Sequence, residues 1–239
     1  MQVKLSQAVK MFFGNSSLEM VFFEAIANAL DAEANEITIS ITAKALNQPE
    51  TLQIEISDNG LGFTNERYNK FSKLFDVEES SHKGLGRLVY LCYFDDVKVI
   101  SNYDKVKVRE FDFNEGFKED NFKSSIVPET KSGTVFKMTS YVLQRIAKNE
   151  YVSADYLKSR ILQEFYSRLF HLKDNAQREV ININTNIENH KKELILLNSD
   201  IPKFKTVELE SSVNLIDTFY LHYSIKEVDP SESSLIAAV

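Results

Sequence analysis

The chain of 239 residues contains a single cysteine and no long apolar segment. Cys92 alone can form neither an internal disulfide nor a cysteine-based zinc site. No apolar run approaches the ~20 residues that cross a bilayer, and the first residues lack the basic start and apolar core of a signal peptide. We therefore expect a protein of the reducing cytoplasm that does not enter a membrane.

Basic residues are outnumbered, since 28 Lys and Arg face 35 Asp and Glu and give a net charge of −7. A general grip on nucleic-acid phosphates needs a basic face, which this balance does not favour. The one local basic stretch comprises Lys98, Lys105, Lys107 and Arg109. We interpret it as a solvated hairpin, so binding of nucleic acid is not supported by this chain.

Hydrophobic periodicity predicts the secondary structure. Helical spacing marks 3–13, 18–30 and 153–170, and shorter helices are expected near 67–75 and 84–94. Alternation predicts strands over 36–44, 51–58, 97–101, 105–113, 134–140, 180–187 and 193–197. The stretch 114–131 shows no clear period and is expected to be a connection. Ser16 and Glu19 have capping-box spacing for the helix that follows.

The pattern resets near Ile201-Pro202, after which 207–209 and 218–225 predict a new sheet. We therefore assign residues 1–200 to a first domain. Residues 201–239 are expected to begin a second, incomplete domain.

The first chemical motif is a polar helix face formed by Glu24, Asn28 and Asp31, at i, i+4 and i+7. The carbonyl oxygen of Asn28 suits Mg²⁺, a hard cation that takes oxygen ligands and keeps several waters. Glu24, one turn earlier, can orient and deprotonate an attacking water. A plain solvated helix face is the alternative if this motif is taken alone.

Asp58 carries the second motif, because it falls in phase with the buried side of the alternating segment 52–58. A buried carboxylate is costly unless it is hydrogen-bonded. The exocyclic amine of adenine is a suitable partner, whereas guanine offers a carbonyl at that position. A turn aspartate is the alternative, and Gly60 and Gly62 fit both, since glycine permits positive φ or close approach of a ligand.

The third motif is a glycine loop that opens an apolar helix. Backbone amides at a helix start bind anions, and glycines let phosphates approach. The candidate phosphate contacts are Lys83, Gly84, Leu85, Gly86 and Arg87. The polar stretch 76–83 before them predicts a lid over a nucleotide. His82 in this stretch can be considered as a base, but a lid-surface role is favoured.

Together with Gly133-Thr134, and in this order, the motifs resemble those of the GHKL ATPases. This superfamily shares the Bergerat fold and includes DNA gyrase, the large heat-shock chaperone, sensor histidine kinases and MutL-type mismatch-repair proteins. Glu24 and Asn28 match its N box, and Asn28-Ala-Leu-Asp31-Ala is close to the MutL and MORC types. Asp58, Gly60 and Gly62 match its adenine motif, and Gly84 and Gly86 its lid glycines. The resemblance covers about residues 1–200.

The resemblance implies an α+β fold, a two-layer sandwich of a mixed, mostly antiparallel sheet with helices on one face. It implies ATP and Mg²⁺ as cofactors, with Mg²⁺ at Asn28 and Glu24 as the general base. Asp58 and Thr134 would bind adenine. The second domain would be transducer-like and would supply a lysine to the γ-phosphate, which no residue here matches.

The expected function is ATP hydrolysis that drives nucleotide-controlled homodimerisation, a switch for an unidentified effector process such as DNA handling or bacterial defence. Phosphotransfer of the histidine-kinase type is an alternative. It is disfavoured because only 23 residues and no histidine precede Glu24. An ATP sensor without turnover is a third possibility, against which Glu24 argues.

Overall fold

The computed structural model describes residues 9, 11, 13–73, 85–174, 180–201, 205–209 and 219–223. Most of the predicted first helix, 3–13, and all of the predicted lid, 76–83, lie outside these ranges. Residues 9, 11 and 13 are helical. None of the described helices is both long and apolar enough to cross a membrane.

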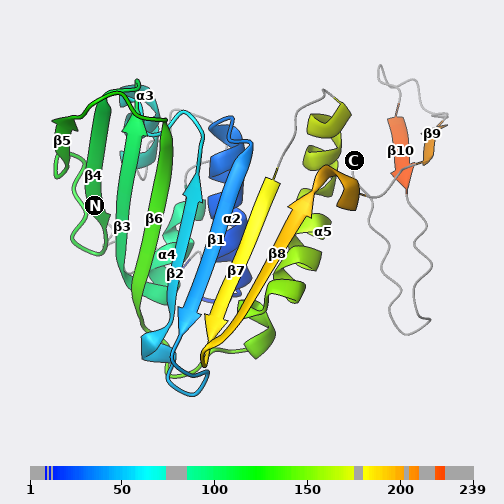
Figure 1. Cartoon of the computed structure of the whole chain (residues 1–239), viewed down its shortest axis with the longest axis horizontal. Helices are drawn as coiled ribbons and strands as arrows, with labels where there is room; N and C mark the ends of the chain where they lie inside the picture. The colour runs from blue at the N-terminus through cyan, green and yellow to red at the C-terminus, as the bar shows by residue number, and fades with distance from the viewer. Residues whose placement is uncertain are drawn as a thin grey trace.

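One eight-stranded sheet organises the molecule, in the order β5-β4-β3-β6-β2-β1-β7-β8 (Figure 1). The pair β1 and β7 is parallel, and every other neighbouring pair is antiparallel. The strands are β1 (Glu36–Ala43), β2 (Gln53–Asp58), β3 (Phe94–Tyr103), β4 (Lys107–Phe113), β5 (Lys123–Ile126), β6 (Gly133–Tyr141), β7 (Val180–Ile187) and β8 (His190–Leu197). The sheet is thus mixed and mostly antiparallel, as predicted.

The helices α2, α4 and α5 lie on one face of this sheet (Figure 1). The helical elements are α2 (Glu19–Asp31), α3 (Asn65–Ser72), α4 (Tyr90–Tyr93) and α5 (Ala154–Asp174), with 3₁₀ turns η1 (Pro49–Thr51), η2 (Gly86–Val89), η3 (Asn149–Val152) and η4 (Asn198–Asp200). This arrangement confirms the predicted two-layer α+β fold. A separate antiparallel pair, β9 (Lys205–Leu209) and β10 (Phe219–Tyr223), forms the predicted second sheet. The domain boundary near residue 200 stays a prediction.

Packing of α2 on the sheet fixes which of its residues can act. Phe22 and Ile26 are fully buried, as is Ile39 on the inner face of β1. Burying side chains of this size contributes roughly 1.5–3 kcal/mol each. Because the apolar stripe of α2 points into the core, Glu24 and Asn28 are only partly buried. They lie on the part of α2 that contacts η2.

Three local predictions were wrong. The capping box at Ser16 and Glu19 does not form, because α2 begins at Glu19 after Leu18 and has no side-chain cap. The predicted helix over 84–94 is shorter, since η2 and α4 fill only 86–93 and β3 begins at Phe94. The predicted connection 114–131 contains β5, an edge strand whose four residues are all exposed. Without a buried face, β5 shows no alternation that the sequence could reveal.

Candidate functional site

Glu24, Asn28 and Gly86 meet where α2 contacts η2. Nδ2 of Asn28 donates a hydrogen bond of 3.0 Å to Oε1 of Glu24, one helical turn away. The backbone of Gly86 lies so close to this carboxylate that a β-carbon there would overlap Oε2 and lie 2.6 Å from Cδ of Glu24. The structure therefore brings the first motif and the third motif together.

The carboxylate of Glu24 has an environment suited to a base. Burial raises its pKa, and the Asn28 amide and the nearby positive charge of Arg87 partly oppose that rise. A raised pKa makes the ionised form of a carboxylate a stronger proton acceptor. Glu24 is thus a candidate proton acceptor.

Asp58 lies at the end of β2, opposite Thr134 of β6. Burial raises the pKa of Asp58 to about 6, although hydrogen bonds from the backbone of Gly60 and Thr134 favour the charged form. The N–H of Gly60 donates to Oδ1 of Asp58 at 2.8 Å. Asp58 is therefore a partly buried hydrogen-bond acceptor that is mostly ionised at neutral pH.

Ser101 of β3 is a site residue that the sequence did not reveal. Its fully buried hydroxyl group lies 3.2 Å from Oγ1 of Thr134 and accepts a 2.7 Å hydrogen bond from the N–H of Phe63. Gly62 has φ +70°, and a β-carbon there would lie 2.7 Å from this hydroxyl oxygen. Ser101 thus connects Thr134 to the loop of the adenine motif, a contact between strands distant in sequence.

Asn59 fastens the start of the same loop. Its Oδ1 accepts hydrogen bonds of 3.0 Å from the backbone N–H groups of Asn35 and Glu36. The N–H of Leu61 donates to the carbonyl of Ala32 at 2.8 Å. The loop that follows Asp58 is thereby tied to the segment after α2.

Arg109 corrects the interpretation of the basic stretch as a solvated hairpin, because its side chain is only 3% exposed. Its Nη1 donates to the carbonyl oxygens of Phe63 at 2.7 Å and Thr64 at 3.2 Å. Its Nη2 donates to Oδ1 of Asn65 at 2.6 Å. Arg109 therefore holds the far end of the adenine-motif loop rather than facing solvent.

The third motif is only partly described. Lys83 and Gly84 lie outside the described residues, and Leu85 is partly buried against the core. Arg87 is buried, donates from Nη2 to the carbonyl of Lys73 at 3.1 Å, and lies 4.9 Å above the ring of Phe71. Burial lowers the pKa of Arg87 to about 10, so the guanidinium still carries a positive charge at neutral pH.

Asp31, the third member of the helix face, forms its ion pair away from Glu24, although its charge raises the pKa of Glu24. Its Oδ1 pairs with Nη2 of Arg168 on α5 at 2.8 Å, and its side chain is largely exposed. Arg67 also donates to its backbone carbonyl at 2.9 Å. The structure thus gives Asp31 a role in joining α2 to α5, and its contact with a cofactor stays a prediction.

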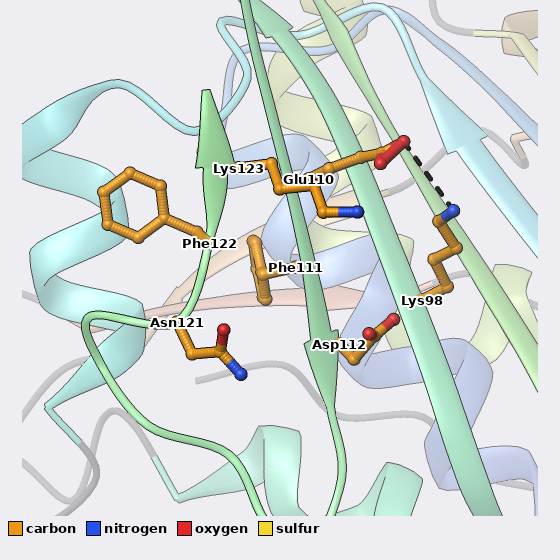
Figure 2. Close-up of a pocket in the computed structure, with 7 residues that line it drawn as sticks. All are labelled: Lys98, Glu110, Phe111, Asp112, Asn121, Phe122 and Lys123. Atoms are coloured by element: carbon orange, nitrogen blue, oxygen red, sulfur yellow. Dashed lines mark ion pairs between the residues drawn. The ribbon is translucent and has the colours of Figure 1, made fainter. Parts of the chain in front are cut away.

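A small hollow lies elsewhere, between β3, β4 and the segment before β5 (Figure 2). Its lining includes the ion pair between Lys98 and Glu110, whose Nζ and Oε1 are 3.7 Å apart. None of the motif residues lines it. Among the described residues, no group of three or more His, Cys, Asp or Glu side chains gathers as a metal site.

Residues 14–140, more than half of the chain, match the family described as histidine kinase-, DNA gyrase B- and HSP90-like ATPases. The chain belongs to this family. The assignment to the GHKL ATPases supports ATP binding and a function of the ATP-hydrolysing type. Comparison with curated proteins returned no match.

Solved structures with 16% identity share the fold. One is the ATP-binding domain of topoisomerase IV from Francisella tularensis in complex with a small-molecule inhibitor. The match covers 79% of this chain and 92% of that domain, with a TM-score of 0.51. For the N-terminal domain of a DNA repair protein the shares are 87% and 64% and the TM-score is 0.50. The match to the Aquifex aeolicus MutL ATPase domain complexed with ADP covers 89% of this chain and 78% of that domain, with a TM-score of 0.49. The chain thus spans less than two thirds of the DNA repair domain.

Proposed function

We propose that this GHKL ATPase binds ATP with Mg²⁺, hydrolyses it, and uses the nucleotide to control association of two copies of the chain. The observation that carries the proposal is that the first and third motifs meet on α2 and that the second motif is tied to the segment directly after this helix. Glu24 contacts both Asn28 and Gly86, while the Asp58 loop is tied to the residues that follow the same helix. One bound nucleotide can span both groups.

Asp58 would select adenine. Its carboxylate accepts a hydrogen bond from Gly60 and has further acceptor capacity for an exocyclic amine. Thr134, held by Ser101, offers a hydroxyl group beside it for a direct or water-mediated contact. Guanine presents a carbonyl oxygen where adenine presents the amine, so GTP would bring two acceptors together.

Asn28 fits Mg²⁺ by the chemistry of its remaining polar atom. Because Nδ2 donates to Glu24, the carbonyl oxygen Oδ1 is left to act as a ligand. A single amide oxygen is sufficient where phosphate oxygens and water fill the other positions, as Mg²⁺ prefers. When bound, Mg²⁺ would neutralise charge on the phosphates.

Glu24 would act as the general base, and the backbone beside Gly86 would receive phosphate oxygens. Lys83, Gly84, Leu85 and Arg87 are the further proposed phosphate contacts. Arg87 retains its charge near Glu24, so it contributes positive potential on that side of the site.

Dimerisation and the effector process are the broader part of the proposal. A protein that acts as a nucleotide switch must adopt different conformations with and without bound nucleotide. We expect a monomer without nucleotide and a dimer with a non-hydrolysable ATP analogue. Sedimentation velocity tests this, and an unchanged sedimentation coefficient at saturating analogue would contradict it.

The decisive experiment for nucleotide binding is calorimetric titration of Asp58→Asn with ATP. We expect binding to be lost with the circular-dichroism spectrum unchanged, because the amide presents a donor to the adenine amine. Asp112→Asn is the matched control, since Asp112 is an exposed aspartate in the hollow of Figure 2. Equal affinity of the parent for ATP and GTP would overturn the adenine assignment.

A further inference from the structure

Tyr90 is fully buried, yet its hydroxyl group has no well-aligned hydrogen-bond partner among the described residues. The side chain is 0% exposed, and its ring centroid lies 5.6 Å from that of Phe136. Within the described part of the chain, no group makes a well-aligned hydrogen bond with Oη, although the Asn28 amide is close enough to lower the pKa of this hydroxyl group as a hydrogen-bond donor. A buried hydroxyl without a partner is costly, and such a group in a binding site is explained where a ligand or water completes the bond.

The position of Tyr90 places this hydroxyl in the proposed ATP site. Tyr90 begins α4 directly after η2, the turn that contains Gly86. Gly86 contacts Glu24, and α2 lies against η2. Burial raises the pKa of Tyr90 well above its ordinary value and Glu24 raises it further, whereas the Asn28 amide lowers it. The hydroxyl therefore lies near Glu24 and Asn28, and it stays protonated.

The amide of Asn28 requires orientation if it is to bind a metal. Its Nδ2 has two hydrogens, of which one is donated to Oε1 of Glu24. A phenol oxygen can accept the second hydrogen, and both bonds together keep Oδ1 directed away from Glu24. The phenol also has one proton to donate, which suits a water molecule.

We propose that Tyr90 is a positioning residue of the ATP site, whose hydroxyl group accepts from Nδ2 of Asn28 and donates to a water molecule that enters with Mg·ATP. This inference rests on the proposed function, because the orientation of Asn28 matters only if Asn28 binds Mg²⁺. The tyrosine acts through Asn28 and does not itself contact the metal.

The test compares Tyr90→Phe with Tyr141→Phe. Tyr141 is a matched control, because it is only 6% exposed and its hydroxyl group also lacks a partner, but it packs on Tyr93 and Phe94 instead of the motif residues. ATP binding is measured by calorimetry over a range of Mg²⁺ concentrations and in EDTA. Thermal unfolding of each variant is measured in parallel.

We expect Tyr90→Phe to raise the Mg²⁺ concentration at half-maximal ATP binding about three- to tenfold, the worth of one hydrogen bond. Binding in EDTA should not fall, and the unfolding temperature should change no more than it does in Tyr141→Phe, since the hydroxyl makes no well-aligned bond in the free protein. Tyr141→Phe should change neither quantity. In an Asn28→Ala background, Tyr90→Phe should have no further effect on Mg²⁺ dependence.

Three results would overturn the inference. An unchanged Mg²⁺ dependence in Tyr90→Phe, with a parent that binds ATP, removes the positioning role alone. A full effect of Tyr90→Phe in the Asn28→Ala background shows that the hydroxyl does not act through Asn28. A parent that does not bind ATP overturns the proposed function itself, and this inference with it.

Discussion

The backbone of Gly86 lies against the carboxylate of Glu24, so a β-carbon at position 86 would overlap Oε2 of that side chain. The atom in the way is the end of a flexible side chain, which can turn aside at little cost in stability. Catalysis is less tolerant, because a shift of about 1 Å in a reacting group can cost about 10²-fold in rate.

We therefore predict that Gly86→Ala lowers ATP turnover by about 10²-fold while the unfolding temperature hardly changes. Gly116→Ala is the control, since the nearest atom to its β-carbon is 3.4 Å away. Steady-state phosphate release and thermal unfolding are measured for both. Full activity in Gly86→Ala would show that the carboxylate does not need its present position.

Glu24→Gln should separate binding from hydrolysis. Glutamine keeps the shape and can still accept from Asn28, but it cannot take a proton from water. We expect turnover to fall by roughly 10²–10⁴-fold, the usual worth of a general base, with ATP affinity preserved in calorimetry. Glu36→Gln, at an exposed position on β1, should leave both unchanged. Turnover at the parent's rate would exclude Glu24 as the base.

The sequence was sufficient for the parts of the fold that have one buried face. The alternation in β1 and the apolar stripe of α2 predicted both elements, because each has one buried face. Ile39 lies on the buried face of β1, and Phe22 lies on that of α2. The edge strand β5 has no such face and was missed. The capping box failed because the spacing of Ser16 and Glu19 does not specify where the backbone begins to turn.

For the candidate site, the sequence named the residues that we propose contact a ligand but not those that hold them. Ser101 and Arg109 act through contacts with Phe63, on a different strand or loop, which no local pattern contains. The buried hydroxyl of Tyr90 in an apolar run looks the same in sequence as an ordinary core aromatic. Its missing partner is visible only in three dimensions.

The raised pKa of Asp58, about 6, predicts opposite effects of pH on binding and on stability. ATP affinity should fall as the pH drops below about 6, because a protonated Asp58 loses its charge as an acceptor. Calorimetry between pH 5 and 8 measures this. A flat affinity profile would contradict the role of the ionised carboxylate in adenine binding.

For stability the sign is reversed. Between the ordinary pKa of 3.8 and about 6, the native state binds more protons at Asp58 than the unfolded state does. The contribution of Asp58 to the free energy of unfolding is thus highest at low pH and is lost as the pH rises to about 6. Denaturant unfolding of the parent and of Asp58→Asn gives this contribution as their difference at each pH. A difference that does not vary with pH would contradict the shift.

The adenine-motif loop should depend on Arg109, because the planar guanidinium group donates several hydrogen bonds to it at once. It reaches the carbonyls of Phe63 and Thr64 and the side chain of Asn65, which lysine, with one nitrogen, cannot do together. We predict that Arg109→Lys lowers the free energy of unfolding by about 2–4 kcal/mol, because buried carbonyls lose their partners at about 1–3 kcal/mol each. ATP affinity should fall as well, since this loop begins at Asp58.

The control is Arg145→Lys, at an exposed position after β6. It should leave unfolding and affinity unchanged, because an exposed arginine replaced by lysine keeps its charge and its hydration. Denaturant unfolding and ATP calorimetry on both variants separate two contributions of Arg109. If Arg109→Lys is destabilised but binds ATP with the parent's affinity, Arg109 supports the sheet edge alone. If its stability matches that of Arg145→Lys, the hydrogen bonds to Phe63 and Thr64 do not hold the loop.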